Sequence, residues 1–132
     1  MLDVLGLTAE AFPITVVIVN ADAHERARLV ALATRAGHKV IEAATGSEIL
    51  ARLTPSPRTV VVVDRNAGDM TASQMLLQLR LKGMEIPTVV TVPPLAILEA
   101  VDAIRTGARD VLEYPLGEQR FLHSIAEAVK SQ

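Results

Sequence analysis

The chain has 132 residues, half of them apolar and about a fifth charged, which is the composition of one globular domain. Its net charge is −2, from 13 basic and 15 acidic residues, which argues against a surface dedicated to nucleic acid or to anionic membranes. It has no cysteine, which excludes disulfides and Cys-based zinc sites. No apolar run approaches the ~20 residues of a membrane span. The first dozen residues lack the basic charge of a signal peptide, so a cytoplasmic protein is expected.

The apolar pattern predicts one domain over residues 14–132, preceded by an N-terminal extension over residues 1–13. Runs of β-branched residues predict strands, and apolar residues at helical spacing predict the helices between them. In chain order the expected elements are a strand at Thr15–Val19, a helix at Glu25–Ala36, a strand at Lys39–Ala43, a short helix from about Thr45 to Leu53, a strand at Thr59–Val63, a helix at Ala72–Lys82, a strand at Thr88–Val92, a helix at Leu95–Thr106, a strand at Arg109–Leu112 and a helix at Gly117–Lys130.

Strands that alternate with helices favour a parallel sheet, because each helix is long enough for a right-handed crossover. We therefore expect an α/β fold with a doubly wound, five-stranded parallel sheet and five helices. Four consecutive valines at 60–63 indicate a central strand covered on both faces. Asp64 follows them where the strand would end, and ligands of open α/β sheets collect at this edge. Asp64 is therefore the first candidate functional residue.

Five stretches resemble the receiver (CheY-like) domain of bacterial two-component response regulators. They are VVIVNADAHERARL, AGHKVIEAATGSEIL, VVVVDRNAGDM, IPTVVTV and IRTGARDVLEYPL, and together they span about Ile14 to Lys130. The resemblance implies a flavodoxin-like fold with strand order 2-1-3-4-5. In this family an aspartate accepts a phosphoryl group from a histidine kinase, and two acids after the first strand help to hold Mg²⁺. A Ser or Thr ends the fourth strand, and a Lys precedes a proline after the fifth.

By this resemblance, Asp64 occupies the phosphoacceptor position, and the backbone carbonyl of Asn66 occupies that of a metal ligand. The paired acids fall on Asn20 and Ala21. Because Ala21 offers no side-chain oxygen, Asp64 and Asn66 would bind Mg²⁺ weakly at most, and no other cofactor is expected. Asp22 is interpreted as a helix N-cap, with replacement of the missing acid as the alternative.

The two switch positions of the family are also substituted in this chain. The strand-four hydroxyl position falls on Val92, with Thr91 one residue early and therefore expected to point to the other face. The lysine position falls on Tyr114, directly before Pro115. Each loss resembles the deletion of a transition-state donor, which costs roughly 2–4 kcal/mol. Phosphorylation is thus expected to be slow or absent, and we expect no enzymatic activity.

The sequence therefore predicts an atypical receiver domain that acts through protein contacts in signalling or transcriptional control. We expect a homodimer through the 95–130 face, which carries interspersed charges of both signs, and contact with a partner protein or a downstream effector domain. No membrane contact and no direct nucleic-acid contact are expected. Two alternatives are a conventional receiver phosphorylated on Asp64 by a histidine kinase, and a small-ligand module that uses the cleft at the strand ends.

Three further hypotheses have weaker support in the sequence. The segment from Asp22 to Ala27 partly matches the Asp-x-His-x-x-Gly pattern of cobalamin-binding domains, but Ala27 replaces the glycine. The loop after the first strand lacks the Ser, Thr and Gly cluster of a flavodoxin phosphate cradle. His38 and His123 lie on different expected elements, which disfavours a histidine metal site.

Overall fold

The computed structural model describes residues 13–130, in which five strands alternate with five helices. The expected extension at residues 1–13 lies outside the described residues except for Pro13. In chain order the elements are β1 (Thr15–Val19), α1 (Ala23–Arg35), β2 (Lys39–Ala43), α2 (Gly46–Arg52), β3 (Thr59–Asp64), α3 (Ala72–Leu81), β4 (Thr88–Val92), α4 (Ile97–Thr106), β5 (Asp110–Glu113) and α5 (Glu118–Lys130). None of the helices in residues 13–130 is long and apolar enough to cross a bilayer.

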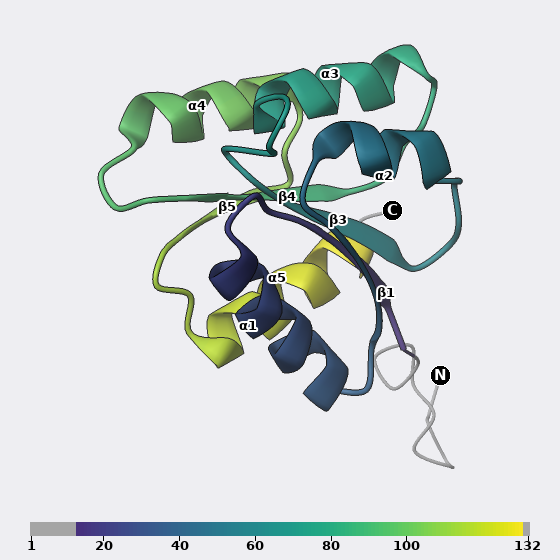
Figure 1. The fold of residues 1–132 in the computed structure, drawn as a ribbon, viewed down its shortest axis with the longest axis vertical. Helices are drawn as coiled ribbons and strands as arrows, with labels where there is room; N and C mark the ends of the chain where they lie inside the picture. Colours follow the sequence, from purple (N-terminus) through teal and green to yellow (C-terminus); the bar gives the residue numbers. More distant parts are fainter. Residues whose placement is uncertain (1–12, 131–132) are drawn as a thin grey trace.

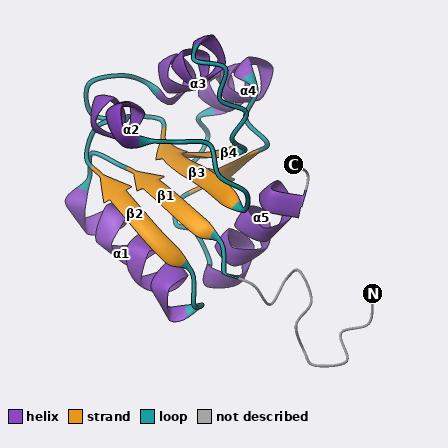
Figure 2. Cartoon of the chain, turned by 90° about the vertical axis from the view of Figure 1, so that its right-hand side faces the viewer, coloured by secondary structure: helices purple, strands orange, loops and turns teal. Residues whose placement is uncertain are grey.

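The strands form one parallel sheet in the order β2-β1-β3-β4-β5, which confirms the predicted fold class. Helices α1 and α5 cover one face, and α2, α3 and α4 cover the other (Figures 1 and 2). Strand β3 lies at the centre, and all six of its residues are buried. The run of valines is explained by this position, because a central parallel strand faces a hydrophobic layer on both sides.

Alternate residues of the strands divide the apolar core into two layers. Val60 and Val62 pack toward α1 and α5, where Phe121 is fully buried. Val61 and Val63 pack on the other side, in the layer that contains residues of α2, α3 and α4. Because side chains alternate along a strand, Asp64 lies on the face of Val60 and Val62. This face carries the candidate site.

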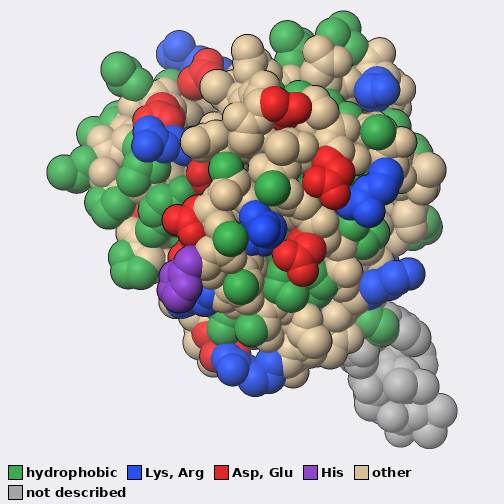
Figure 3. Space-filling view, viewed as in Figure 1, with side chains coloured by type: hydrophobic (Ala, Val, Ile, Leu, Met, Phe, Trp, Pro, Cys, Tyr) green, Lys and Arg blue, Asp and Glu red, His purple; other side chains and the backbone are tan. Residues whose placement is uncertain are grey.

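Helix α4 differs from the sequence-based expectation at its amino-terminal end. It begins at Ile97 rather than Leu95, because Leu95 adopts a left-handed conformation with φ of 66°. Ala103 is the only residue of α4 that is buried, whereas Ile97 and Leu98 are 66% and 84% exposed. Hydrophobic side chains accordingly gather over α4 in Figure 3. The helix thus presents most of its apolar residues to the surface.

The loop between β3 and α3 is anchored on the start of α2. The backbone N–H of Gly46 donates to the carbonyl oxygen of Ala67 at 2.8 Å, and that of Ser47 donates to the Asp69 carboxylate at 3.3 Å. Hydrogen bonds from Ser47 lower the pKa of Asp69. Gly68 has a φ of +78° and passes so close to α2 that a Cβ atom would lie 2.7 Å from the Ala44 carbonyl oxygen. These contacts fix the loop that follows Asp64.

Replacement of Gly68 by alanine should therefore destabilise the domain by more than the cost of placing alanine in a left-handed backbone conformation. Gly83 provides the matched control, because its φ is +71° and a Cβ there would meet no atom within 4 Å. We expect Gly83→Ala to lose about 1 kcal/mol from backbone conformation, and Gly68→Ala to lose at least about 1 kcal/mol more from the steric overlap. Urea unfolding measures both values, and equal losses would contradict the close approach.

Candidate functional site

The candidate site is a cleft of about 420 Å³ at the carboxyl edge of the sheet. Loops that follow β1, β3, β4 and β5 surround it. The cleft brings together six of the residues that the sequence singled out, and excludes Val92. Its lining residues are Asn20, Ala21, Asp22, Glu25, Asp64, Arg65, Asn66, Pro94, Tyr114 and Pro115.

Asp64 lies at the inner wall of the cleft and is 5% exposed. Its Oδ1 atom accepts a hydrogen bond from the Thr91 hydroxyl at 2.8 Å, and its Oδ2 atom accepts one from the backbone N–H of Asn66 at 3.0 Å. Both oxygens therefore already have a protein donor. The carboxylate is held within the end of the sheet rather than projected into open solvent.

The position of Thr91 corrects the expectation that its side chain points away from the site. The register of the sheet pairs Thr91 with Asp64, and paired residues of parallel strands point to the same side. Val92, the next residue, points to the opposite side and is 1% exposed in the core layer that contains residues of α3 and α4. A hydroxyl is thus present beside Asp64, one residue earlier than the family pattern places it.

Burial raises the pKa of the Asp64 carboxyl above its ordinary value. The hydrogen bonds from Asn66 and Thr91 lower the pKa, as does the charge of Arg65, but they do not offset the loss of solvation. Glu25 adds a smaller effect that raises the pKa, because two carboxylates disfavour each other's charge. At neutral pH the ionised Asp64 carboxylate therefore lowers the stability of the folded state.

The segment after β1 uses its polar side chains to begin α1. The Oδ1 atom of Asn20 accepts from the backbone N–H of Asp22 at 2.9 Å. The Oδ1 atom of Asp22 accepts from the backbone N–H groups of His24 and Glu25 at 2.9 and 3.0 Å, which confirms the predicted N-cap. Asn20 is 2% exposed, so its amide is part of the packed sheet edge. These two residues are engaged in local structure.

Ala21 and Tyr114 line the cleft at positions where the resemblance expects charged side chains, and neither is charged. Ala21 has only a methyl group, at the place where the resemblance expects an acid. Tyr114 is half-buried and packs partly against the core layer under α1 and α5. Its backbone N–H donates to the Val92 carbonyl oxygen at 2.9 Å, so its position is set by the end of β4.

Sequence reasoning missed Glu25 and Arg65, which also line the cleft. Glu25 lies in the first turn of α1 beside its N-cap, and Arg65 directly follows Asp64, so their spacing could have indicated both. Arg65 extends toward α4, where its Nη1 atom lies 2.8 Å from Glu99 Oε1. Its charge is therefore shared with a carboxylate outside the cleft.

The side chains of the cleft do not form a good Mg²⁺ site. Asp64 already accepts two hydrogen bonds, and Asp22 caps α1 through the oxygen Oδ1. Across residues 13–130, no three carboxylate or histidine side chains lie close enough together to hold a metal ion. Mg²⁺ prefers six oxygen ligands that include carboxylates. In this cleft Ala21 offers no side-chain oxygen, and hydrogen bonds within the protein already engage both oxygens of Asp64 and one oxygen of Asp22.

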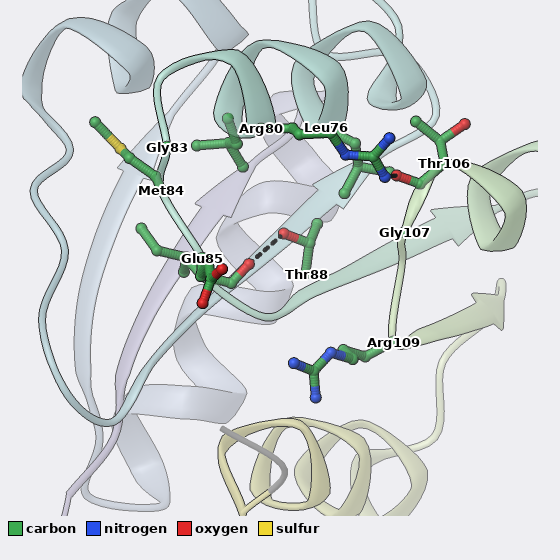
Figure 4. Close-up of a pocket in the computed structure, with 11 residues that line it drawn as sticks. Leu76, Arg80, Gly83, Met84, Glu85, Thr88, Thr106, Gly107 and Arg109 are labelled. Atoms are coloured by element: carbon green, nitrogen blue, oxygen red, sulfur yellow. Dashed lines mark hydrogen bonds between the residues drawn. The ribbon is translucent and has the colours of Figure 1, made fainter.

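A larger cavity, of about 470 Å³, lies at the opposite edge of the sheet (Figure 4). It lies between the end of α3 and the loop that joins α4 to β5. Arg80 spans it by donating to the Thr106 carbonyl oxygen at 2.9 Å, and Thr88 donates to the Ile86 carbonyl oxygen at 3.1 Å. The polar groups named here satisfy one another, so this cavity is a structural junction between the two helices.

Comparison with known proteins identifies structural neighbours. The structure of FixJ-N has 26% sequence identity, covers 92% of this chain and 97% of its own, and gives a TM-score of 0.85. The response regulator StyR has 27% identity over 91% of this chain and 61% of its own, with a TM-score of 0.82. A response regulator receiver protein from Pseudoalteromonas atlantica has 22% identity over 89% of this chain and 98% of its own, with a TM-score of 0.75. No protein-family model and no curated protein sequence matches the chain.

The replacement of Asp64 by asparagine tests the electrostatic cost of the site. Asparagine can accept from the Asn66 N–H and donate to the Thr91 hydroxyl, so both hydrogen bonds can persist. Because the folded pKa of Asp64 is raised, its charge opposes folding above that pKa and has no effect below the unfolded pKa. Asp64→Asn should therefore raise the melting temperature at pH 7.

The gain in melting temperature should shrink as the pH falls through the folded pKa of Asp64 toward 3.8, its ordinary value. Calorimetry over this range provides the measurement. Glu85→Gln, which removes an exposed carboxylate, should give no comparable change. A loss of stability in Asp64→Asn at pH 7 would mean that the charge itself supports the fold.

Proposed function

We propose that this chain, a receiver domain of a two-component response regulator by its structural neighbours, signals through protein contacts rather than through phosphorylation of Asp64. One observation carries the proposal: the three positions that would supply charge beside the phosphoacceptor are Asn20, Ala21 and Tyr114, and none of them is charged. Phosphoryl transfer depends on neutralising the negative charge that spreads over the transferred group. Asp64 lacks both the paired acids that would share a cation and the lysine that would pair with phosphoryl oxygens.

The remaining charges near Asp64 support the same conclusion. Arg65 is the cation of the cleft, and it pairs with Glu99 on α4. Asp22 and Glu25 place two further negative charges in the cleft, which would oppose the arrival of a phosphoryl dianion. The Thr91 hydroxyl already donates to Asp64, so it contributes a hydrogen bond to the unmodified state. The charges and hydrogen bonds of the site thus favour the state in which Asp64 carries no phosphoryl group.

Incubation of the protein with Mg²⁺ and acetyl phosphate, followed by intact mass analysis, tests this proposal. We expect no added phosphoryl group, because the charges that would stabilise the transfer are absent. An active receiver is the positive control, and Asp64→Asn is the negative control. The triple variant Asn20→Asp, Ala21→Asp, Tyr114→Lys restores the charges at the three substituted positions, while Thr91 already supplies a hydroxyl beside Asp64. Labelling of this variant and not of the unmodified chain would identify the missing charges as the cause.

A phosphoryl group on the unmodified chain, and none on Asp64→Asn, would overturn the proposal in favour of a conventional phosphoacceptor. That alternative has one observation in its favour, which is that Asp22 and Glu25 line the same cleft as Asp64. In that case Asp22→Ala should also abolish labelling, whereas loss of an N-cap alone costs about 1 kcal/mol of stability. The alternative of a small ligand in this cleft predicts a compound that copurifies with the protein.

The contacts that replace phosphorylation are proposed to lie on the 95–130 face and to join two copies of the chain. Several charges of this face have partners within the domain, since Arg120 pairs with Asp110 at 3.1 Å and Glu118 with Arg35 at 3.0 Å. The exposed apolar residues of α4 are therefore the stronger basis for an interface. These residues are Ile97, Leu98, Val101 and Ile104.

A lysine at position 98 should disrupt this dimer, because it places a charge at the centre of the apolar face. Sedimentation equilibrium should show a dimer for the unmodified chain and a monomer for Leu98→Lys at the same concentration. Leu81→Lys is the matched control, since Leu81 is 71% exposed and lies on α3, outside the proposed face. A monomeric unmodified chain, or dissociation by Leu81→Lys alone, would contradict the assignment.

A further inference from the structure

A second cleft lies on the α2 face of the sheet, near the amino-terminal ends of β1 and β2. Helix α2 has seven residues and ends at Arg52, so it covers the strands near their carboxyl ends (Figure 2). The chain then leaves through an irregular loop before β3. A cleft of about 310 Å³ lies between this loop, the end of α2 and the sheet. We call it the α2 cleft.

The α2 cleft combines an apolar floor with a polar rim. Ile49 is 1% exposed and forms part of the floor, together with Val17 from the sheet. Registered pairs of the parallel sheet place Thr15 beside Lys39 and Thr59, which brings their side chains to the same face. The complete lining is Thr15, Val17, Lys39, Ile41, Ile49, Arg52, Leu53, Thr54, Ser56 and Thr59.

Thr59 provides an observation that points to a ligand. Its side chain is almost completely buried, with 2% of the residue exposed. Its hydroxyl oxygen is the one buried side-chain polar atom of residues 13–130 that has no hydrogen-bond partner. Buried hydroxyl groups in native proteins normally have a partner, and a missing one costs roughly 1–3 kcal/mol. Because Thr59 lines the α2 cleft, a polar group bound there would supply that partner once the buried hydroxyl turns toward it.

The charges of the rim favour an anion. Lys39 and Arg52 line the α2 cleft, and no acidic residue does. Lys39 forms no ion pair within residues 13–130. Arg52 has only long contacts, 3.5 Å to the Glu48 carboxylate and 3.5 Å to the Glu42 carbonyl oxygen. Both cations are exposed and can therefore turn toward a ligand without breaking a strong interaction.

We propose that the α2 cleft binds a small organic anion with an apolar body, of the class of aromatic or branched aliphatic monocarboxylates. The apolar part contacts the partly exposed side chains of Ile41 and Leu53. The carboxylate lies between Lys39 and Arg52, and the Thr59 hydroxyl, turned toward the α2 cleft, donates to one of its oxygens. The volume is at the lower end of the ~300–1,000 Å³ of small-molecule sites, which suits a compound of this size.

Titration of the isotopically labelled full chain, followed by NMR, tests the proposal. The probes are phenylacetate and 4-methylpentanoate, each compared with its neutral amide. We expect saturable shifts for amides of β1, β2 and β3 that border the α2 cleft, and weaker binding of the neutral amides. Lys39→Gln and Arg52→Gln should each weaken binding of the acids about tenfold, as the loss of a hydrogen bond to a charged group does. Lys82→Gln, at an exposed lysine of the α3 end outside this lining, is the matched control.

Thr59→Val separates the role of the hydroxyl from that of the fold. The substitution removes an unpartnered buried hydroxyl, so thermal stability should be unchanged or raised while binding of both acids weakens. Absence of saturable shifts at millimolar probe, equal shifts with acids and amides, or unchanged binding in Lys39→Gln and Arg52→Gln would each overturn the proposal. The result is independent of Asp64, because the α2 cleft shares no residue with the candidate functional site, so failure here leaves the proposed function unaffected.

Discussion

The central position of β3 is the constraint on which the rest of the structure depends. A strand that is buried on both faces must be apolar along its length, and it must have parallel neighbours that are themselves covered by helices. This arrangement brings the ends of β1, β3 and β4 to one edge and places the buried Asp64 carboxylate among them. The same burial that shapes the fold raises the pKa of that carboxylate.

The hydrogen bonds of Asp64 connect the fold to the proposed function. Thr91 and Asn66 satisfy the carboxylate without a cation, so the unmodified state is complete by itself. Arg65 leaves the cleft to pair with Glu99, which links the loop after β3 to α4. In physical terms, hydrogen bonds within the protein hold the Asp64 carboxylate but do not fully offset the cost of its burial, and the apolar residues of α4 are exposed at the surface.

Two surfaces of the domain follow from short or lightly packed helices. Helix α4 rests on the sheet through Ala103, so its larger apolar residues face outward. Helix α2 has only seven residues, so it leaves the α2 cleft uncovered over the amino-terminal ends of β1, β2 and β3. Both features lie away from Asp64, and they are the surfaces proposed to bind a second copy of the chain and a small anion. They lie on the same side of the sheet, which α2, α3 and α4 share.

The sequence by itself determined the order of the elements, the parallel topology and the position of Asp64, because these depend on periodicity and on runs of apolar residues along the chain. It also predicted the Asp22 cap, which is a local interaction. The tertiary structure alone decided that Thr91 faces Asp64 and that α4 exposes its apolar residues. These facts depend on the register between strands and on how deeply each helix packs, and neither is encoded by the spacing of residues within one element.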